Sequence, residues 1–170
     1  CDGAALEALK LISKWLKVAF DQPENINARG GMLIGSCLAG VAFTKGLGLV
    51  HSISHMVGAE YNTQHGLTNA IILPAVMEFN LPHVGEKVRY ISQAMDLTEA
   101  SSTIILEDIG KILDYVDIPR SLSEIGVPLE CKRRIAEKAM LDSATGTNPR
   151  VAKVDDIEEL TEISILHARE

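Results

Sequence analysis

Apolar side chains recur every three or four residues along most of this 170-residue chain, a spacing that places them on one face of an α-helix. The same spacing predicts helices over residues 4–20, 26–45, 48–57, 67–80, 82–95, 98–116, 129–141 and 155–168. No alternation of apolar and polar residues reaches the length of a β-strand. The pattern therefore predicts an all-α fold in which the helices pack as one bundle-like domain over residues 1–170.

The breaks between these helices carry turn-forming residues. Residues 21–25, DQPEN, separate the first two helices, and residues 58–66, GAEYNTQHG, predict a loop after the third. Pro74 has no backbone N–H to donate, so it predicts an interruption within residues 67–80. Small residues gather at Gly30, Gly31, Gly35 and Gly40, and their spacing predicts close packing between helices rather than a dinucleotide-binding turn.

Three of the five histidines, His51, His55 and His65, lie within fifteen residues of one another. His51 and His55 are four residues apart, which places both rings on one face of a helix. His65 precedes Gly66, where a turn can bring its ring back toward the same point. Neutral imidazole binds Zn, Fe, Ni and Cu, so the cluster indicates a transition-metal site. The alternative is a group of helix histidines that are solvated or hydrogen-bonded in a core.

Composition narrows the classes of function. The hydrophobic content of 46% and the charged content of 23% are typical of a globular protein. A net charge of −7 disfavours nucleic acid and anionic membrane as partners, because both bind basic surfaces. The longest nearly uncharged stretch, residues 30–44, is shorter than a bilayer span. Cys1, Cys37 and Cys131 are too widely spaced for a C-x-x-C site and are odd in number, so we expect a reducing compartment, the cytoplasm.

A longer motif surrounds the histidines. Residues 43–80 read FTKGLGLVHSISHMVGAEYNTQHGLTNAIILPAVMEFN. They contain Gly-Leu-Gly, H-x3-H, N-T-x-H-G and N-A-x-x-L-P-x-V-M-x-x-N in that order. This run resembles the signature of the iron-containing (group III) alcohol dehydrogenases. Weaker similarity to the same family covers residues 1–13, CDGAALEALKLIS, residues 141–150, LDSATGTNPR, and residues 154–163, VDDIEELTEI.

The resemblance implies a fold, a metal and roles for individual residues. The fold would be the all-helical C-terminal domain of the dehydroquinate synthase-like and iron alcohol dehydrogenase proteins. In this family one aspartate and three histidines hold Fe²⁺, and His51 and His65 match two of those histidines. His55 matches a residue beside the metal, near the nicotinamide ring and the substrate, that is implicated in proton movement. We therefore expect His55 to be catalytic and to contact the cofactor, with Zn²⁺ as the alternative metal.

The family's other two ligands lie in a D-x-x-x-H helix, and no D-x-x-x-H occurs in residues 1–170. Asp2 does not take the aspartate's place, because its context matches the helix that follows the ligand helix. A glycine-rich phosphate-binding turn of the G-G-G-S type is also missing from the sequence. We therefore expect a domain truncated at its N-terminus, without the nucleotide-binding α/β domain that would hold most of the NAD or NADP.

The function expected from these observations is the metal-binding portion of a nicotinamide-dependent alcohol dehydrogenase, inactive as an isolated chain. Its substrate would be a small alcohol or aldehyde, and the sequence leaves open a homo-oligomer. The alternative is a stand-alone helical metal-binding or interaction module without catalysis. A zinc hydrolase is disfavoured because Ser52, not glutamate, follows His51. The zinc-dependent glycerol dehydrogenases and dehydroquinate synthases match residues 43–80 less well.

Overall fold

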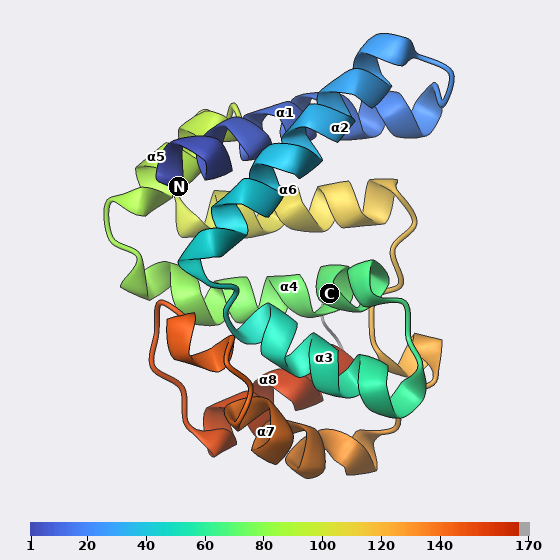
Figure 1. Ribbon diagram of the computed structural model, residues 1–170, viewed down its shortest axis with the longest axis vertical. Helices are drawn as coiled ribbons and strands as arrows, with labels where there is room; N and C mark the ends of the chain where they lie inside the picture. Colours follow the sequence, from blue (N-terminus) through green and yellow to red (C-terminus); the bar gives the residue numbers. More distant parts are fainter. Residues whose placement is uncertain (167–170) are drawn as a thin grey trace. The chain divides into compact units, whose positions relative to one another are not determined.

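The computed structural model describes residues 1–166, which form helices joined by turns and loops (Figure 1). The α-helices are α1 (Asp2–Asp21), α2 (Ile26–Ala42), α3 (Leu49–Tyr61), α4 (His65–Asn80), α5 (Lys87–Ala94), α6 (Ser102–Tyr115), α7 (Lys132–Met140) and α8 (Val154–Leu166). Short 3-10 turns are η1 (Phe43–Lys45), η2 (Leu81–His83), η3 (Ser123–Ile125), η4 (Leu129–Cys131) and η5 (Thr145–Thr147). No strand occurs among residues 1–166, so the prediction of an all-α fold is confirmed.

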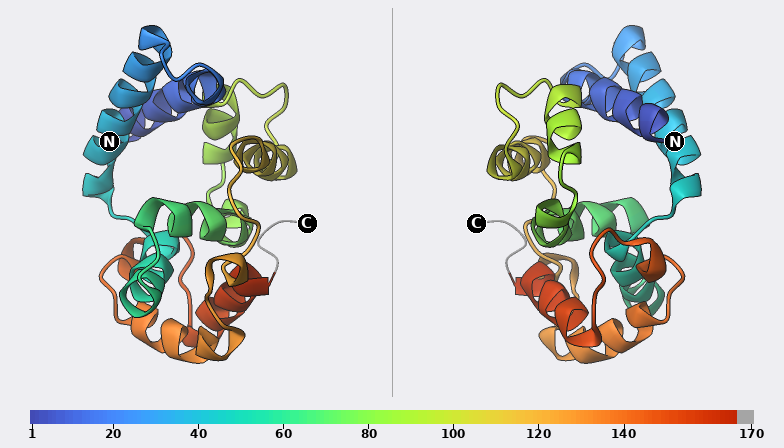
Figure 2. Two further views of the ribbon diagram at one scale, coloured as in Figure 1. Left: turned by 90° about the vertical axis from the view of Figure 1, so that its right-hand side faces the viewer. Right: turned by 90° about the vertical axis from the view of Figure 1, so that its left-hand side faces the viewer.

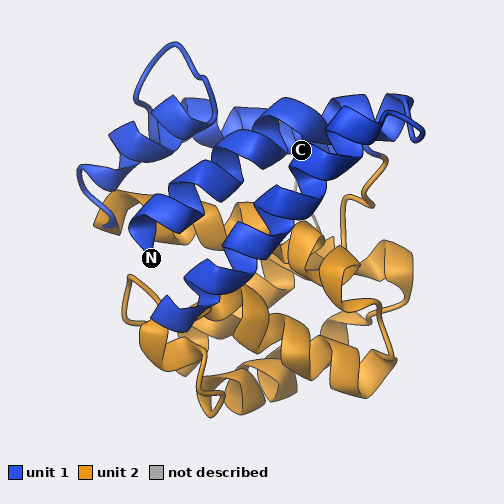
Figure 3. Cartoon of the chain, turned by 45° about the horizontal axis from the view of Figure 1, so that its top comes forward, with its two compact units in different colours: residues 1–45, 84–116 blue, residues 46–83, 117–170 orange. Residues whose placement is uncertain are grey.

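The chain divides into two compact units, each made of two separate stretches of sequence (Figure 3). Unit 1 comprises residues 1–45 and 84–116, and unit 2 comprises residues 46–83 and 117–170. Unit 1 therefore holds α1, α2, α5 and α6, whereas unit 2 holds α3, α4, α7 and α8. All three clustered histidines belong to unit 2. That the whole chain forms one domain stays a prediction.

In unit 1, α1 and α2 form a helical hairpin (Figures 1 and 2). The side chain of Asn25 caps α2 by accepting a hydrogen bond from Ala28 N at 3.1 Å. Gly31 lies under the indole of Trp15, and Gly35 packs against Ile12, so these two glycines serve helix packing as predicted. The prediction is wrong for Gly30 and Gly40, which face open space.

Ile26–Lys45, which joins α2 to η1, is long and apolar enough to cross a membrane when judged by length and composition alone. The helical segment extends beyond the uncharged stretch of residues 30–44. The expectation that this part of the chain is too short to span a bilayer is therefore corrected. Its outward side carries apolar side chains, including Ile26, Leu33 and Val41. A single helix of this composition is weak evidence for a membrane, because core helices of water-soluble proteins pass the same test.

In unit 2, four helices surround the main hydrophobic core. α3 packs against α4 and α7, and α8 packs against α4 and α7 (Figure 2). Each helix contributes a fully buried isoleucine to this core: Ile53, Ile71, Ile135 and Ile157. Burial of such side chains is the dominant stabilising contribution in a fold of this kind. It fixes α3 and α4, the helices that carry the histidines.

Asn148 ties the start of α3 to the end of α4. Its Oδ1 accepts hydrogen bonds from Leu49 N at 3.2 Å and from Asn80 Nδ2 at 3.0 Å. Its Nδ2 donates to Asn80 Oδ1 at 2.7 Å. Gly48, the N-cap of α3, has φ 93°, and a Cβ there would lie 3.0 Å from Asn148 Oδ1, so glycine suits this position. The three contacts place the first turn of α3, two residues before His51.

The connection between α3 and α4 is shorter than the sequence indicates. α3 continues through Gly58 to Tyr61, and α4 begins at His65, so the loop predicted over residues 58–66 shrinks to residues 62–64. Asn62 ends α3 in the left-handed conformation with φ 53°, which asparagine tolerates. The side chain of Gln64 caps α4 by accepting a hydrogen bond from Leu67 N.

Pro74 does not interrupt α4, so that prediction is wrong. Proline removes one backbone donor, but the helix on both sides is held by buried side chains, among them Ile71 and Val76. Elsewhere the predicted ends differ by a few residues: α5 begins at Lys87 and α6 at Ser102. The predicted end of the last helix, at residue 168, lies outside the described residues.

The neighbouring glycines of α2 provide a matched test of this packing. We expect Gly31→Ala to destabilise the chain by about 1–3 kcal/mol, because its Cβ would overlap the Trp15 indole. Gly30→Ala meets no atom and should stabilise the helix by about 0.5–1 kcal/mol. Urea unfolding of the two variants and the parent chain measures both changes. Equal effects of the two substitutions would contradict this packing of α1 on α2.

Candidate metal centre

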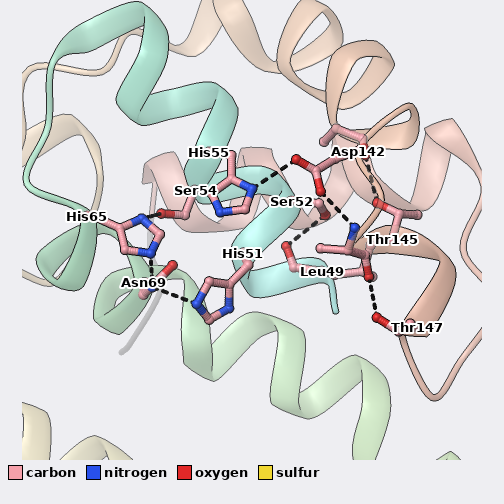
Figure 4. Close-up of polar contacts among 12 residues, drawn as sticks. Leu49, His51, Ser52, Ser54, His55, His65, Asn69, Asp142, Thr145 and Thr147 are labelled. Atoms are coloured by element: carbon pink, nitrogen blue, oxygen red, sulfur yellow. Dashed lines mark hydrogen bonds and ion pairs between the residues drawn. The ribbon is translucent and has the colours of Figure 1, made fainter. Parts of the chain in front are cut away.

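The three histidines of the sequence cluster meet in unit 2 (Figure 4). His51 and His55 lie one turn apart on α3, and His65 is the first residue of α4. The ring centroids are 5.3 Å apart for His51 and His65, 5.5 Å for His55 and His65, and 5.8 Å for His51 and His55. The prediction that a turn returns His65 to the helix pair is therefore confirmed.

Two of the rings direct a nitrogen at the same atom. Asn69 Nδ2 lies 3.3 Å from Nε2 of His51 and 3.1 Å from Nε2 of His65 (Figure 4). Asn69 follows His65 by four residues on α4, so the two side chains share a helix face. The Nε2 atoms of His51 and His65 thus converge on one point, as two ligands of one ion must.

The other nitrogen of His65 faces a buried hydroxyl. Ser54 Oγ lies 3.3 Å from His65 Nδ1, and Ser54 is 1% exposed. A hydrogen bond at the second ring nitrogen is the usual way in which a protein orients a metal-binding histidine. Ser54 stands on the same helix as His51, so α3 itself helps to orient the ring at the start of α4.

Electrostatics keeps His51 in the form that can bind a cation. Burial lowers the pKa of His51 below its ordinary value, and the positive charges that His65 and His55 can carry lower it further. The carboxylate of Asp142 opposes this shift but does not cancel it. At neutral pH the ring is therefore uncharged, as a metal ligand must be.

His55 contacts an acidic residue, Asp142, that the sequence did not predict as part of the site. Its Nδ1 lies 2.9 Å from Asp142 Oδ2 (Figure 4). Burial alone would raise the pKa of the Asp142 carboxyl, but the hydrogen bonds from Ala144 N and His55 lower it overall, together with the positive charge that His55 and His51 carry when they are protonated. Asp142 lies in the 141–150 segment that resembles the dehydrogenase family, although nothing in its spacing links it to His55.

A cavity of about 390 Å³ adjoins the histidines within unit 2. His51 and Asn69 line it together with mostly apolar side chains, including Leu73, Val76 and Met77. A concave apolar pocket with a few polar groups is typical of a small-molecule site. The remaining histidine of the described part, His83, is exposed in η2.

The donor set fits part of a transition-metal site. Nε2 of His51 and of His65 are two convergent imidazole donors, the chemistry that Zn²⁺ and Fe²⁺ favour. A tetrahedral site needs four ligands. Within residues 1–166, no group of three or more His, Cys, Asp or Glu side chains could hold a metal ion.

Comparison with known proteins places the chain in a family. The model of the Fe-containing alcohol dehydrogenase family, C-terminal region, matches residues 1–165. The chain is 37% identical over 166 residues to the NAD-dependent methanol dehydrogenase of Bacillus methanolicus, covering 94% of this chain and 44% of that protein. It is 38% identical over 169 residues to the lactaldehyde reductase of Escherichia coli K12, covering 94% of this chain and 43% of that protein.

Solved structures agree with the sequence comparison. A crystal structure of 1,3-propanediol oxidoreductase superposes with a TM-score of 0.90 at 32% identity, over 96% of this chain and 45% of that one. The alcohol dehydrogenase of Oenococcus oeni superposes with a TM-score of 0.91 at 29% identity, over 96% and 44%. The chain thus spans less than half the length of these relatives. It belongs to the Fe-containing alcohol dehydrogenase family and corresponds to the family's C-terminal, all-α region.

Proposed function

We propose that this chain is the metal-binding half of a nicotinamide-dependent alcohol dehydrogenase that interconverts small alcohols and aldehydes. The observation that carries the proposal is the convergence of the Nε2 atoms of His51 and His65 on one point. Family membership supports it, as do the names of the relatives, which give methanol, lactaldehyde and 1,3-propanediol as their substrates. Because those relatives are more than twice as long, the activity would belong to a protein that also supplies the nucleotide site and the remaining ligands.

In this proposal His51 and His65 hold a divalent metal. Membership of the family favours Fe²⁺, whereas the affinity order of divalent metals for such ligands favours Zn²⁺. When bound, such an ion polarises the substrate oxygen and lowers the pKa of an alcohol, which prepares it to release hydride to NAD or NADP. The apolar walls of the adjoining cavity would exclude water and receive the carbon chain of the substrate. The free thiols Cys1, Cys37 and Cys131 suit a cytoplasmic enzyme.

His55 is the proposed proton carrier, as its match to the family implies. Its Nδ1 faces Asp142 Oδ2, so the carboxylate holds the Nδ1 proton and leaves Nε2 as the basic nitrogen. The ring stacks on His65 with an interplanar angle of 16°, which keeps it beside the proposed ligands. The unprotonated Nε2 of a neutral imidazole can take the hydroxyl proton of an alcohol and pass it outward.

The first test is a calorimetric titration of this chain with Zn²⁺ and, without oxygen, with Fe²⁺. We expect one weak site, because two nitrogens are half of a tetrahedral set, and we expect it to vanish in the double variant His51→Ala, His65→Ala. His83→Ala is the matched control, since this histidine is exposed and lies apart from the cluster. Binding that survives the double variant would remove both histidines from the site.

A second prediction concerns His55. In the complete dehydrogenase, His55→Ala should lower kcat by about 100-fold or more, the usual contribution of a general acid or base, while metal content stays normal. Steady-state kinetics and metal analysis of the same preparation measure the two quantities. Normal turnover with normal metal content would show that His55 does not carry the proton.

A third prediction follows from the lowered pKa of Asp142. A carboxyl whose pKa is lower in the folded state stabilises the fold above its unfolded value of about 3.9, and this contribution is lost as the pH falls through the folded value. The parent chain should therefore be more stable than Asp142→Asn at about pH 5, and the difference should shrink toward about pH 3. Urea unfolding at several pH values measures it. A difference that does not change with pH would contradict the lowered pKa of the Asp142 carboxyl.

A further inference from the structure

The side chain of Asn69 contacts both proposed ligand atoms, and the proposed function gives this residue no role of its own. Its Nδ2 reaches Nε2 of His51 at 3.3 Å and Nε2 of His65 at 3.1 Å. The side-chain amide has two N–H bonds on this nitrogen, so it can donate one hydrogen bond to each ring. One side chain from α4 therefore contacts both proposed ligand atoms.

This arrangement has a consequence for the protons on the rings. A ring nitrogen that accepts from Asn69 carries no proton, so each neutral imidazole must bear its proton on Nδ1. In His65 that Nδ1 proton can be donated to Ser54 Oγ at 3.3 Å. The Nδ1–H form is also the form in which a metal binds at Nε2, because the lone pair there is unprotonated.

The side-chain oxygen of Asn69, unlike its nitrogen, lacks a partner within residues 1–166. Asn69 Oδ1 is buried and has no hydrogen-bond partner among the described residues. A buried carbonyl without a partner is unfavourable, and such exceptions are rare in folded proteins. In this orientation the amide nitrogen contacts both rings, while the oxygen lacks a partner in the described part of the chain.

We propose that Asn69 is a positioning residue of the metal centre: before a metal binds, it holds His51 and His65 in the Nδ1–H form with both Nε2 lone pairs directed at one point. The inference rests on the proposed function, since it takes these histidines as ligands. An arriving cation replaces the amide N–H groups and finds both rings already oriented. Such preorganisation reduces the ordering that binding requires.

The test is a ¹⁵N NMR measurement of the imidazole nitrogens in the metal-free chain at about pH 8, above the ordinary imidazole pKa of about 6.5. In the parent chain we expect a protonated Nδ1 and an unprotonated Nε2 in both His51 and His65. Leucine in Asn69→Leu has a similar volume but no hydrogen-bond donor. For each lost hydrogen bond, the ratio of rings protonated at Nδ1 to rings protonated at Nε2 should fall about fivefold. Asn69→Asp presents only acceptors, so the protons should move to Nε2.

His83 provides the internal control, because its exposed ring should give the same nitrogen shifts in all three proteins. Backbone amide spectra show whether each variant keeps the fold. Protonated Nε2 atoms in the parent chain, or proton positions unchanged in both folded variants, would overturn the role of Asn69. If the NMR result overturns the role of Asn69 but zinc binding still requires His51 and His65, the proposed function stands. If zinc binding is the same without His51 and His65, the proposed function itself is refuted.

Discussion

The geometry of the candidate centre depends on the three-residue turn between α3 and α4. Asn62 leaves α3 in the left-handed conformation, and Gln64 caps α4, so His65 becomes the first residue of the next helix. Here the reversal sets the centroid of the His65 ring 5.3 Å from that of His51, on a helix pair fixed by a common core. The constraint is therefore one of backbone conformation, and the chemistry follows from it.

The side chains seen in contact with the histidines, together with Asn148, which holds the first turn of α3, also lie in unit 2. Ser54 and Asn69 come from the histidine helices themselves, whereas Asp142 and Asn148 come from the later stretch of the same unit. The site thus combines local contacts, fixed by helical spacing, with contacts across more than eighty residues of sequence, fixed by the packing of α3 on α7. This division explains which parts could be predicted.

Helical periodicity was sufficient for the fold class and for placing His51 and His55 on one helix face, because both depend on spacings of three and four residues. The return of His65 depends instead on the turn at residues 62–64. Periodicity failed at Pro74, where burial of neighbouring side chains outweighs one lost hydrogen bond, and at Gly30, where the spacing does not say which face meets α1. Asp142 could not be predicted as the partner of His55, since their contact arises only when α3 packs beside the segment after α7. Asn69 stood within the recognised motif, but its position on the face of His65 acquires meaning only once His51 is beside it.

The same contacts explain why residues 1–166 do not form a complete metal site. Two neutral imidazoles leave the double charge of a divalent ion uncompensated, and an anionic ligand is the usual remedy. Asp142 is the carboxylate that interacts with these rings, yet its Oδ2 is taken by His55 Nδ1 and its Oδ1 by Ala144 N at 2.8 Å. Moving the carboxylate away from His55 Nδ1 to reach a metal would release His55 from its orientation. Under the proposed function, Asp142 therefore serves to orient His55, and the longer protein would supply the anionic ligand of the metal.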